Sequence, residues 1–297
     1  MKKPVVVGAV GLASTLLLAG CGGSNNSGGS TATATTTSAA APITASGKVQ
    51  ILYAGSLANL MEHDIGPAFA KASGATYEGT GAGSTALVTE IKGKVRPADV
   101  FVSASTDANT GLMGTANGDW EDWYATFATA PLVIGYNPRS KFAADIKSKP
   151  WQQVITETGF LMGSTDPKLD PKGKLAAQAL TTANIPSSAV QVFPEEQLVG
   201  RLQAGQLDAG FFYSSEATEV GIPTIPLGAA YKLKATYTVS VLNNAPNSAG
   251  GIAFVRYLFS NAGVAFMKKH GLQLQPITVT GTKSDVPSAL DAPLGVK

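Results

Sequence analysis

Two serines each follow a glycine, at points where an apolar or glycine-rich segment gives way to helical spacing. Gly55 and Ser56 lie in "YAGSL", and Gly83 and Ser84 lie in "GAGST". The first residues of a helix have amide groups without intrahelical partners, and that end of the helix is partially positive. Two such starts, each with a hydroxyl donor, can hold an anion without arginine or lysine. Ordinary helix capping by serine is the alternative.

Enzyme chemistry has little support in the same sequence. His63 and His270 are the only histidines, and a Ser-His-Asp arrangement would need one of them as its base. Spacing places His270 at the end of a helix and His63 on a polar helix face. No G-x-S-x-G elbow, H-E-x-x-H motif or Walker loop occurs, and "GTGAG" at 79–83 does not match G-x-G-x-x-G. We therefore expect neither an enzyme nor a cofactor nor a protein-held metal ion, with a secreted hydrolase as the weaker alternative.

The first residues have the layout of a secretory signal. Lys2 and Lys3 precede an apolar run of roughly 16 residues, which is shorter than a membrane-spanning helix needs. The run ends in "LAGC", which resembles the bacterial lipoprotein box, so Cys21 is the predicted lipidation site. We expect a signal peptide at 1–20 and a disordered tether, rich in Gly, Ser and Thr, at 21–47. This predicts a secreted protein, lipid-anchored to the outer face of the cell membrane.

Composition narrows the remaining possibilities. Cys21 is the only cysteine, which excludes an intramolecular disulfide and a thiolate metal site. A hydrophobic content of 44% with 14% charged residues indicates a globular body, which we expect to begin near Lys48. The net charge of +2 is too small to indicate a nucleic-acid partner.

Apolar segments and helical stripes alternate along the body. "KVQILYAGS" predicts a strand, and apolar residues spaced by three and four from Leu57 predict a helix that Gly66-Pro67 should kink or restart. "TALVTEIKGK" predicts a second helix and "ADVFVSAS" a second buried strand. "APLVIGYNP" at 130–138 predicts a strand that crosses into a second lobe. This alternation is typical of an α/β fold with parallel strands and crossover helices.

The second half repeats this pattern. "PWQQVI" predicts a short helix, "GFLMGS" a strand, and "TDPKLDPKGKLAAQAL" a loop that runs into a helix. "EEQLVGRLQAGQ" predicts a helix and "LDAGFFYSS" a strand. "YKLKATYTVSVL" predicts an extended return crossing, and two amphipathic helices follow it.

Taken together, these motifs resemble one known family. The "AGSL" and "GS" turns, "ADVFVSAS", "DPKLDPKGK", "LDAGFFYSSEA" and "NNAPNSAGG" resemble segments of the periplasmic molybdate/tungstate-binding proteins of ABC importers. The resemblance covers residues 48–275. It implies a monomer that captures molybdate or tungstate with high affinity and delivers it to an ABC permease.

The resemblance also implies an architecture. We expect a two-lobed clamp in which each lobe is a mostly parallel sheet flanked by helices, with the ligand cleft at the hinge. The expected first lobe comprises 48–130 and 235–280, and the expected second lobe comprises 131–234. Residues 281–297 are expected to form a C-terminal tail.

The implied site draws on both lobes. Ser56 and Ser84, with Gly55 and Gly83, would bind the anion from the first lobe. From the second lobe, the resemblance implies Tyr213 and either Asp170 or its neighbouring amides.

One position departs from the tungstate-type members, which have a glutamate before the tyrosine where this chain has Phe212. The departure favours a hydrogen-bonded tetrahedral anion over a six-coordinate metal. Asp170 would then repel a dianion, unless it points away or binds a protonated oxygen. Phosphate offers such an oxygen near neutral pH, whereas molybdate, tungstate and sulfate do not.

Other cargoes stay open. Sulfate, phosphate or an organic acid would suit the same clamp, although an organic acid should meet an arginine, and only Arg96 and Arg139 are candidates. A ferric ion commonly needs adjacent tyrosines, and the pair here is Phe212-Tyr213. A surface adhesin without a small ligand is the remaining alternative.

Overall fold

The computed structural model describes residues 42–296. The predicted signal peptide, Cys21 and most of the predicted tether lie outside these residues. The last tether residues, 42–47, lie against the body, because the Ala45 amide donates to the Ser73 carbonyl and the Thr76 amide to the Gly47 carbonyl. Among the described residues, no helix combines the length and the apolar character needed to cross a bilayer.

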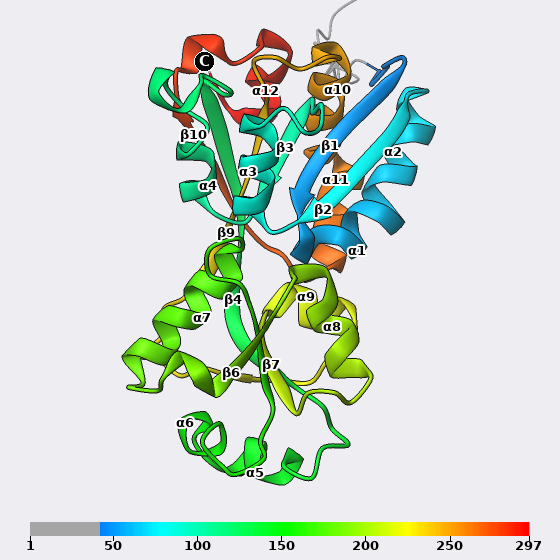
Figure 1. Cartoon of the computed structure of the whole chain (residues 1–297). Helices are drawn as coiled ribbons and strands as arrows, with labels where there is room; N and C mark the ends of the chain where they lie inside the picture. The colour runs from blue at the N-terminus through cyan, green and yellow to red at the C-terminus, as the bar shows by residue number, and fades with distance from the viewer. Residues whose placement is uncertain (1–41, 297) are drawn as a thin grey trace, which may run out of the picture. The chain divides into compact units, whose positions relative to one another are not determined.

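Strands and helices alternate through most of the described chain (Figure 1). The strands are β1 (Lys48–Ala54), β2 (Thr76–Ala82), β3 (Val100–Ser103), β4 (Trp123–Tyr136), β5 (Met162–Thr165), β6 (Val190–Phe193), β7 (Ala209–Tyr213), β8 (Thr224–Pro226), β9 (Lys234–Val241) and β10 (Gln273–Gly281). The helices are α1 (Ala58–Leu60), α2 (Gly66–Ser73), α3 (Ser84–Lys92), α4 (Thr106–Thr110), α5 (Ala143–Ser148), α6 (Trp151–Val154), α7 (Pro171–Thr182), α8 (Glu195–Gln203), α9 (Ser214–Glu219), α10 (Ser248–Leu258), α11 (Asn261–Lys269) and α12 (Asp291–Leu294).

The first lobe is a sheet with helices on both faces. Its strand order is β2-β1-β3-β9-β4, with β10 on the other edge of β4. Side chains alternate across β1: Ile51 and Tyr53 pack into the core that contains Phe254 of α10, whereas Leu52 packs with Leu87 of α3 on the opposite face. Burial on both faces explains why β1 reads as a continuous apolar run.

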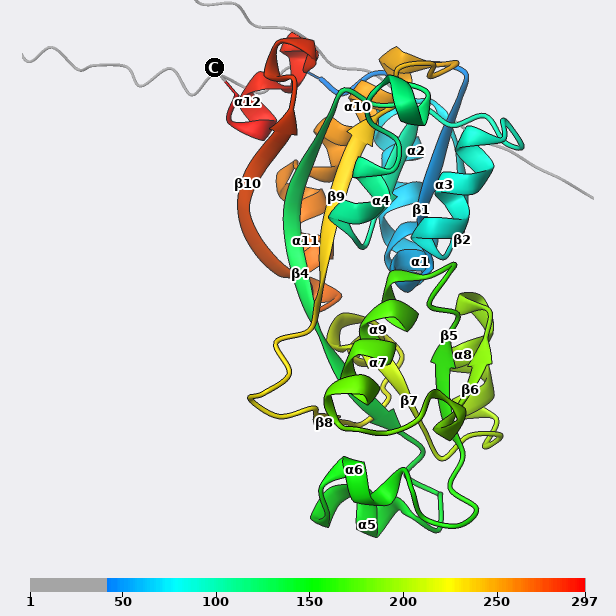
Figure 2. The same cartoon turned by 60° about the vertical axis from the view of Figure 1, so that its left-hand side comes forward.

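Two long strands join this sheet to the second lobe (Figures 1 and 2). The first part of β4 pairs with β9 and β10, and its last residues, from Leu132 onward, pair with β7 and β8. The second sheet continues through β5 to β6. The predicted strand at 130–138 therefore begins earlier, at Trp123, because its first half completes the first sheet.

Both sheets are mixed, which corrects the expectation of mostly parallel sheets. β1 is parallel to β2 and β3, and β5 is parallel to β6 and β7. In the first sheet, β9 is antiparallel to both β3 and β4. In the second sheet, β4 is antiparallel to β7. The two-lobed α/β architecture itself is confirmed.

The sequence predicts one of two local features correctly and the other wrongly. The helical segment after Ser56 passes through a π-helical turn, Met61–Ile65, before α2 restarts with Pro67 in its first turn. This is the predicted restart, since a first-turn proline leaves no interior hydrogen bond unmade. The expected C-terminal tail instead packs on the body, with Val286, Leu290 and Leu294 buried in the same core as α10.

Candidate functional site

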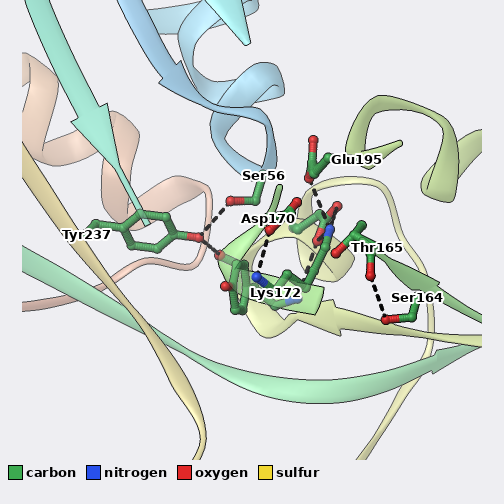
Figure 3. A network of polar contacts seen from close by, with 10 residues as sticks. Ser56, Ser164, Thr165, Asp170, Lys172, Glu195 and Tyr237 are labelled. Atoms are coloured by element: carbon green, nitrogen blue, oxygen red, sulfur yellow. Dashed lines mark hydrogen bonds and ion pairs between the residues drawn. The ribbon is translucent and has the colours of Figure 1, made fainter. Parts of the chain in front are cut away.

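The first predicted turn places Ser56 directly after β1. Gly55–Leu57 forms a single 3₁₀ turn that leads into α1, and the Ser56 side chain is buried. Its hydroxyl lies 3.3 Å from the Tyr237 hydroxyl, which in turn lies 3.5 Å from the Ser215 hydroxyl (Figure 3). Tyr237 belongs to β9 of the first lobe and Ser215 to α9 of the second. A chain of neutral hydroxyls therefore links the two lobes beside this turn.

The second predicted turn places Ser84 at the start of α3. The Ala104 amide donates to the Ser84 oxygen over 3.1 Å, and the side chain is buried. A hydroxyl oxygen that already accepts one bond still has its own proton to donate. Ser84 is thus fixed in position with a free donor, and Gly83 immediately before it lets the backbone of the second lobe approach the turn closely.

Asp170 is buried at the start of α7 in the second lobe. Its Oδ1 accepts from the Lys172 amide at 2.7 Å, which is the N-cap geometry. Its Oδ2 is buried and has no partner among the described residues. Burial, followed by the charge of Glu195, raises the pKa of Asp170 to about 7, against the lowering influence of Lys172.

Two further buried hydroxyls of the second lobe lack hydrogen-bond partners among the described residues. The Tyr213 hydroxyl at the end of β7 and the Thr165 hydroxyl at the end of β5 make no hydrogen bond in the described structure. Burial, and after it the Asp170 carboxyl, raises the pKa of Tyr213, so its hydroxyl keeps its proton. Unpaired buried polar atoms are rare and costly in native proteins, which makes this group of three a candidate ligand site.

The lobes meet at the two predicted glycines. The Ala86 amide of α3 donates to the Leu169 carbonyl of the second lobe at 3.0 Å. A Cβ atom on Gly83 would lie 2.4 Å from that carbonyl oxygen and 3.1 Å from the Asp170 Cβ. A Cβ atom on Gly55 would lie 1.7 Å from Glu195 Oε2. The structure therefore has its lobes in contact at Gly55 and Gly83, with Asp170 next to the Ser84 turn.

A buried lysine lies at the centre of the second-lobe side, and sequence reasoning missed it. Lys172 is 0% exposed, and its ammonium lies 3.0 Å from Glu195 Oε1 and 2.8 Å from Glu216 Oε1 (Figure 3). Glu216 also accepts from the Tyr213 amide. The expectation of a site without lysine or arginine is wrong to this extent: a cation lies within it, but it is already bonded to two carboxylates.

An open cleft of about 370 Å³ adjoins this region. Gly55, Ser56 and Glu62 line it from the first lobe, and Glu195 and Glu216 from the second. Ser84, Asp170 and Tyr213 do not line it. The carboxylates of Glu62, Glu195 and Glu216 make this opening unfavourable for an anion. The candidate anion position is therefore at the buried hydroxyls of Ser84, Thr165 and Tyr213, which we call the inner hydroxyls.

The alternatives raised by the sequence find little support in the geometry. His63 is exposed, and His270 lies between Asp64 and Glu219, so neither pairs with Ser56 or Ser84. No group of three His, Cys, Asp or Glu side chains in the described residues is arranged to hold a metal ion.

The two arginines that an organic acid would need are committed elsewhere. Arg96 pairs with Glu90, and Arg139 donates to the Gln203 carbonyl. Neither belongs to the group of inner hydroxyls.

Comparison with known proteins identifies relatives over most of the chain. Residues 49–273 match the family model described as bacterial extracellular solute-binding protein. A solute-binding protein of Petrotoga mobilis is 26% identical over 76% of this chain and 83% of its own length. The molybdate/tungstate-binding protein of Pyrococcus abyssi is 24% identical over 76% of this chain and 84% of its own length.

A solved structure supports the fold. The periplasmic molybdate-binding protein of Azotobacter vinelandii superposes with a TM-score of 0.64 at 17% identity, over 76% of this chain and 99% of its own. These relatives and neighbours are solute-binding proteins and not enzymes.

Proposed function

Because the chain belongs to the family of bacterial extracellular solute-binding proteins, we propose that it captures molybdate or tungstate outside the membrane and delivers it to an ABC importer. The relatives named for these anions support the choice of cargo. We propose Ser56, Ser84, Asp170 and Tyr213 as its ligand-binding side chains, with Gly55 and Gly83 keeping the lobe contact free of side chains.

One observation carries this proposal. The Ser84 hydroxyl, fixed by Ala104, lies on the first-lobe side of the contact at which Asp170 and the unpartnered Tyr213 hydroxyl are buried on the second. A tetrahedral anion between them would accept from hydroxyls that otherwise have no acceptor. Each hydrogen bond to a charged group contributes about 1.5–3 kcal/mol net, so several of them offset the ordering and closure costs of binding.

The proposed lobe boundaries follow from strand pairing. β4 exchanges partners between Pro131 and Leu132, and β9 returns to the first sheet from Lys234. These points support 48–130 with 235–280 as one lobe and 131–234 as the other, with a hinge in β4 and β9. A ligand that binds between the lobes would favour their contact.

We further propose that Cys21 carries a lipid anchor and that the protein acts as a monomer. The "LAGC" box supports the anchor. Replacement by Cys21→Ala should move the protein from the membrane fraction to the medium, and mass spectrometry of the wild type should show an acylated Cys21. A wild-type protein that is soluble and unacylated would contradict the anchor.

A thermal-shift panel tests the cargo. The full chain is melted with molybdate, tungstate, sulfate, phosphate and citrate, each in excess. A ligand present at 100 times its Kd stabilises the folded protein by about 2.7 kcal/mol. We expect a large shift with molybdate and tungstate, and little with the others. A shift with sulfate, phosphate or citrate alone would replace the cargo within the same clamp, and no shift with any anion would refute the proposed function.

A further inference from the structure

We propose that Asp170 acts in this site as a neutral carboxylic acid that donates a hydrogen bond to the bound anion, so that capture of a dianion above neutral pH takes up one proton. The inference rests on the proposed function and adds a mode of recognition to it. It assigns a donor role to a residue whose charge would otherwise oppose the ligand.

The geometry leaves one carboxyl oxygen for this role. Oδ1 of Asp170 is occupied as the cap of α7, where it accepts from the Lys172 amide at 2.7 Å. Oδ2 is buried, in a residue 5% exposed, without a partner among the described residues. The first lobe closes against this side chain, since a Cβ on Gly83 would lie 3.1 Å from the Asp170 Cβ. The Asp170 side chain is therefore at the contact between the lobes, beside the turn that carries Ser84.

The charges around Asp170 explain why it would hold the proton. Three acids face one cation: Glu195 from α8, Glu216 from α9 and Asp170 itself surround Lys172 of α7. The Lys172 ammonium bonds to Glu195 at 3.0 Å and to both oxygens of Glu216, at 2.8 and 2.9 Å. Its bond to Asp170 uses only the backbone amide. Two carboxylates thus have a counter-ion bonded to them, and the third has none.

The remaining groups around Asp170 do not supply positive charge. From β7, Tyr213 offers a neutral phenol, and the Gly83-Ser84 turn of the first lobe carries no ionisable side chain. Burial raises the pKa of Asp170 to about 7, close to the pH at which such a protein would work. An anion arriving beside Asp170 would raise that pKa further, because a second negative charge disfavours the carboxylate.

The proton balance is simple. Above neutral pH the free protein holds an ionised Asp170, and a molybdate dianion brings no proton. One proton enters from solvent, bonds to Oδ2 and lies between that oxygen and an oxygen of the anion. No other bond forms or breaks. Monohydrogen phosphate would bring its own proton to the same position, so its capture at the same pH would take up fewer protons than capture of molybdate.

Calorimetry of the full chain with sodium molybdate tests this inference. Titrations at pH 6.0 to 8.5, in buffers with different ionisation enthalpies, report the protons taken up with each anion. We expect about one proton at pH 8.5, little uptake at pH 6.0, and a Kd that rises about tenfold per pH unit above the pKa of the free protein. The Asp170→Asn variant should keep the cap through Oδ1 and donate permanently through Nδ2, so it should bind with a Kd independent of pH and without proton uptake.

A matched control is Glu121→Gln, which replaces another buried acid away from the lobe contact and should leave proton uptake unchanged. Wild-type binding that is independent of pH and without proton uptake would overturn this inference while leaving the proposed function intact. The same holds if Asp170→Asn folds, as judged by its melting, but no longer binds. Failure of the wild type to bind any oxyanion at any pH would overturn both proposals.

Discussion

Gly83 and Leu169 approach each other across the two lobes so closely that a Cβ atom on residue 83 would lie 2.4 Å from the Leu169 carbonyl oxygen. The same carbonyl accepts from the Ala86 amide in the first turn of α3. The obstacle is a backbone atom, which cannot rotate away as a side chain can. Contact between the lobes in this arrangement therefore requires glycine at position 83.

Replacing Gly83 by alanine should weaken binding without weakening the fold. Gly83 has φ −57° and ψ 131°, which alanine adopts without strain, so the free energy of unfolding should change by less than about 1 kcal/mol. Closure should be impaired, and the Kd for molybdate, measured by calorimetry, should rise at least about tenfold.

The matched control is Gly200→Ala. A Cβ at Gly200 in α8 meets no atom within 4 Å, so this variant should bind as the wild type does. Wild-type affinity in Gly83→Ala would show that lobe contact at this point is not needed for binding.

Loss of either serine hydroxyl should reduce affinity. Ser56→Ala and Ser84→Ala each remove one donor to a charged ligand, which corresponds to a loss of about 1.5–3 kcal/mol in binding free energy. Equilibrium titration of each variant with molybdate measures this loss.

Ser260→Ala is the control for these substitutions, because Ser260 caps α11 through the Gly263 amide. It should lower the free energy of unfolding by about 1 kcal/mol and leave the Kd unchanged. If all three variants bind equally well, the Ser56 and Ser84 hydroxyls do not contact the anion.

Lys172 should be essential to folding because it neutralises two buried carboxylates. Burial lowers the pKa of Lys172, but the charges of Glu195 and Glu216 outweigh this effect and raise that pKa well above its usual value. Lys172→Met would leave both acids buried without a counter-ion, so the free energy of unfolding should fall by about 3–5 kcal/mol in urea titrations. Adding Glu195→Gln and Glu216→Gln to Lys172→Met should recover much of that loss. If the triple variant is no more stable than Lys172→Met alone, the unpaired carboxylates are not the cause of the lost stability.

Glu121 should make stability fall as pH rises. Burial, opposed by hydrogen bonds from Ser240 and Asn109, raises the pKa of Glu121 from 4.5 to about 8. Between these values the folded protein binds a proton that the unfolded chain has released, so unfolding becomes easier by up to about 1.4 kcal/mol per pH unit.

Urea titrations of Glu121→Gln between pH 5 and 8 should show a correspondingly weaker pH dependence than the wild type, whereas Glu196→Gln, at an exposed acid, should not. An unchanged slope in Glu121→Gln would contradict the assignment of this proton.

Much of the fold could be predicted because its signals are local. The apolar run of β1, the helical stripe after Leu57 and the restart at Pro67 each depend on a few neighbouring residues. The start of β4 at Trp123 and the edge strand β10 were missed, because both depend on antiparallel pairing between segments far apart in sequence. The packing of Leu290 and Leu294 likewise depends on the core surface beneath α10 and α12 and not on their own spacing.

The candidate site divides in the same way. Ser56 and Ser84 could be selected because short glycine-serine turns place them, and Asp170 and Tyr213 because the motifs around them resemble those of a known family. Lys172 could not, because a lysine in the first turn of a helix is usually exposed, and its partners lie 23 and 44 residues further along. An ion pair between residues so far apart in sequence produces no periodic pattern. The one signal in the sequence is that Glu195 and Glu216 lie in the first turns of the two following helices.

The position of the anion is the central claim, and tungsten anomalous scattering from crystals grown with tungstate measures it most directly. We expect one strong peak between the lobes, with anion oxygens within hydrogen-bonding distance of the Ser56 and Ser84 hydroxyls. A strong peak elsewhere, or protein atoms filling the space between these two serines and Tyr213, would contradict it.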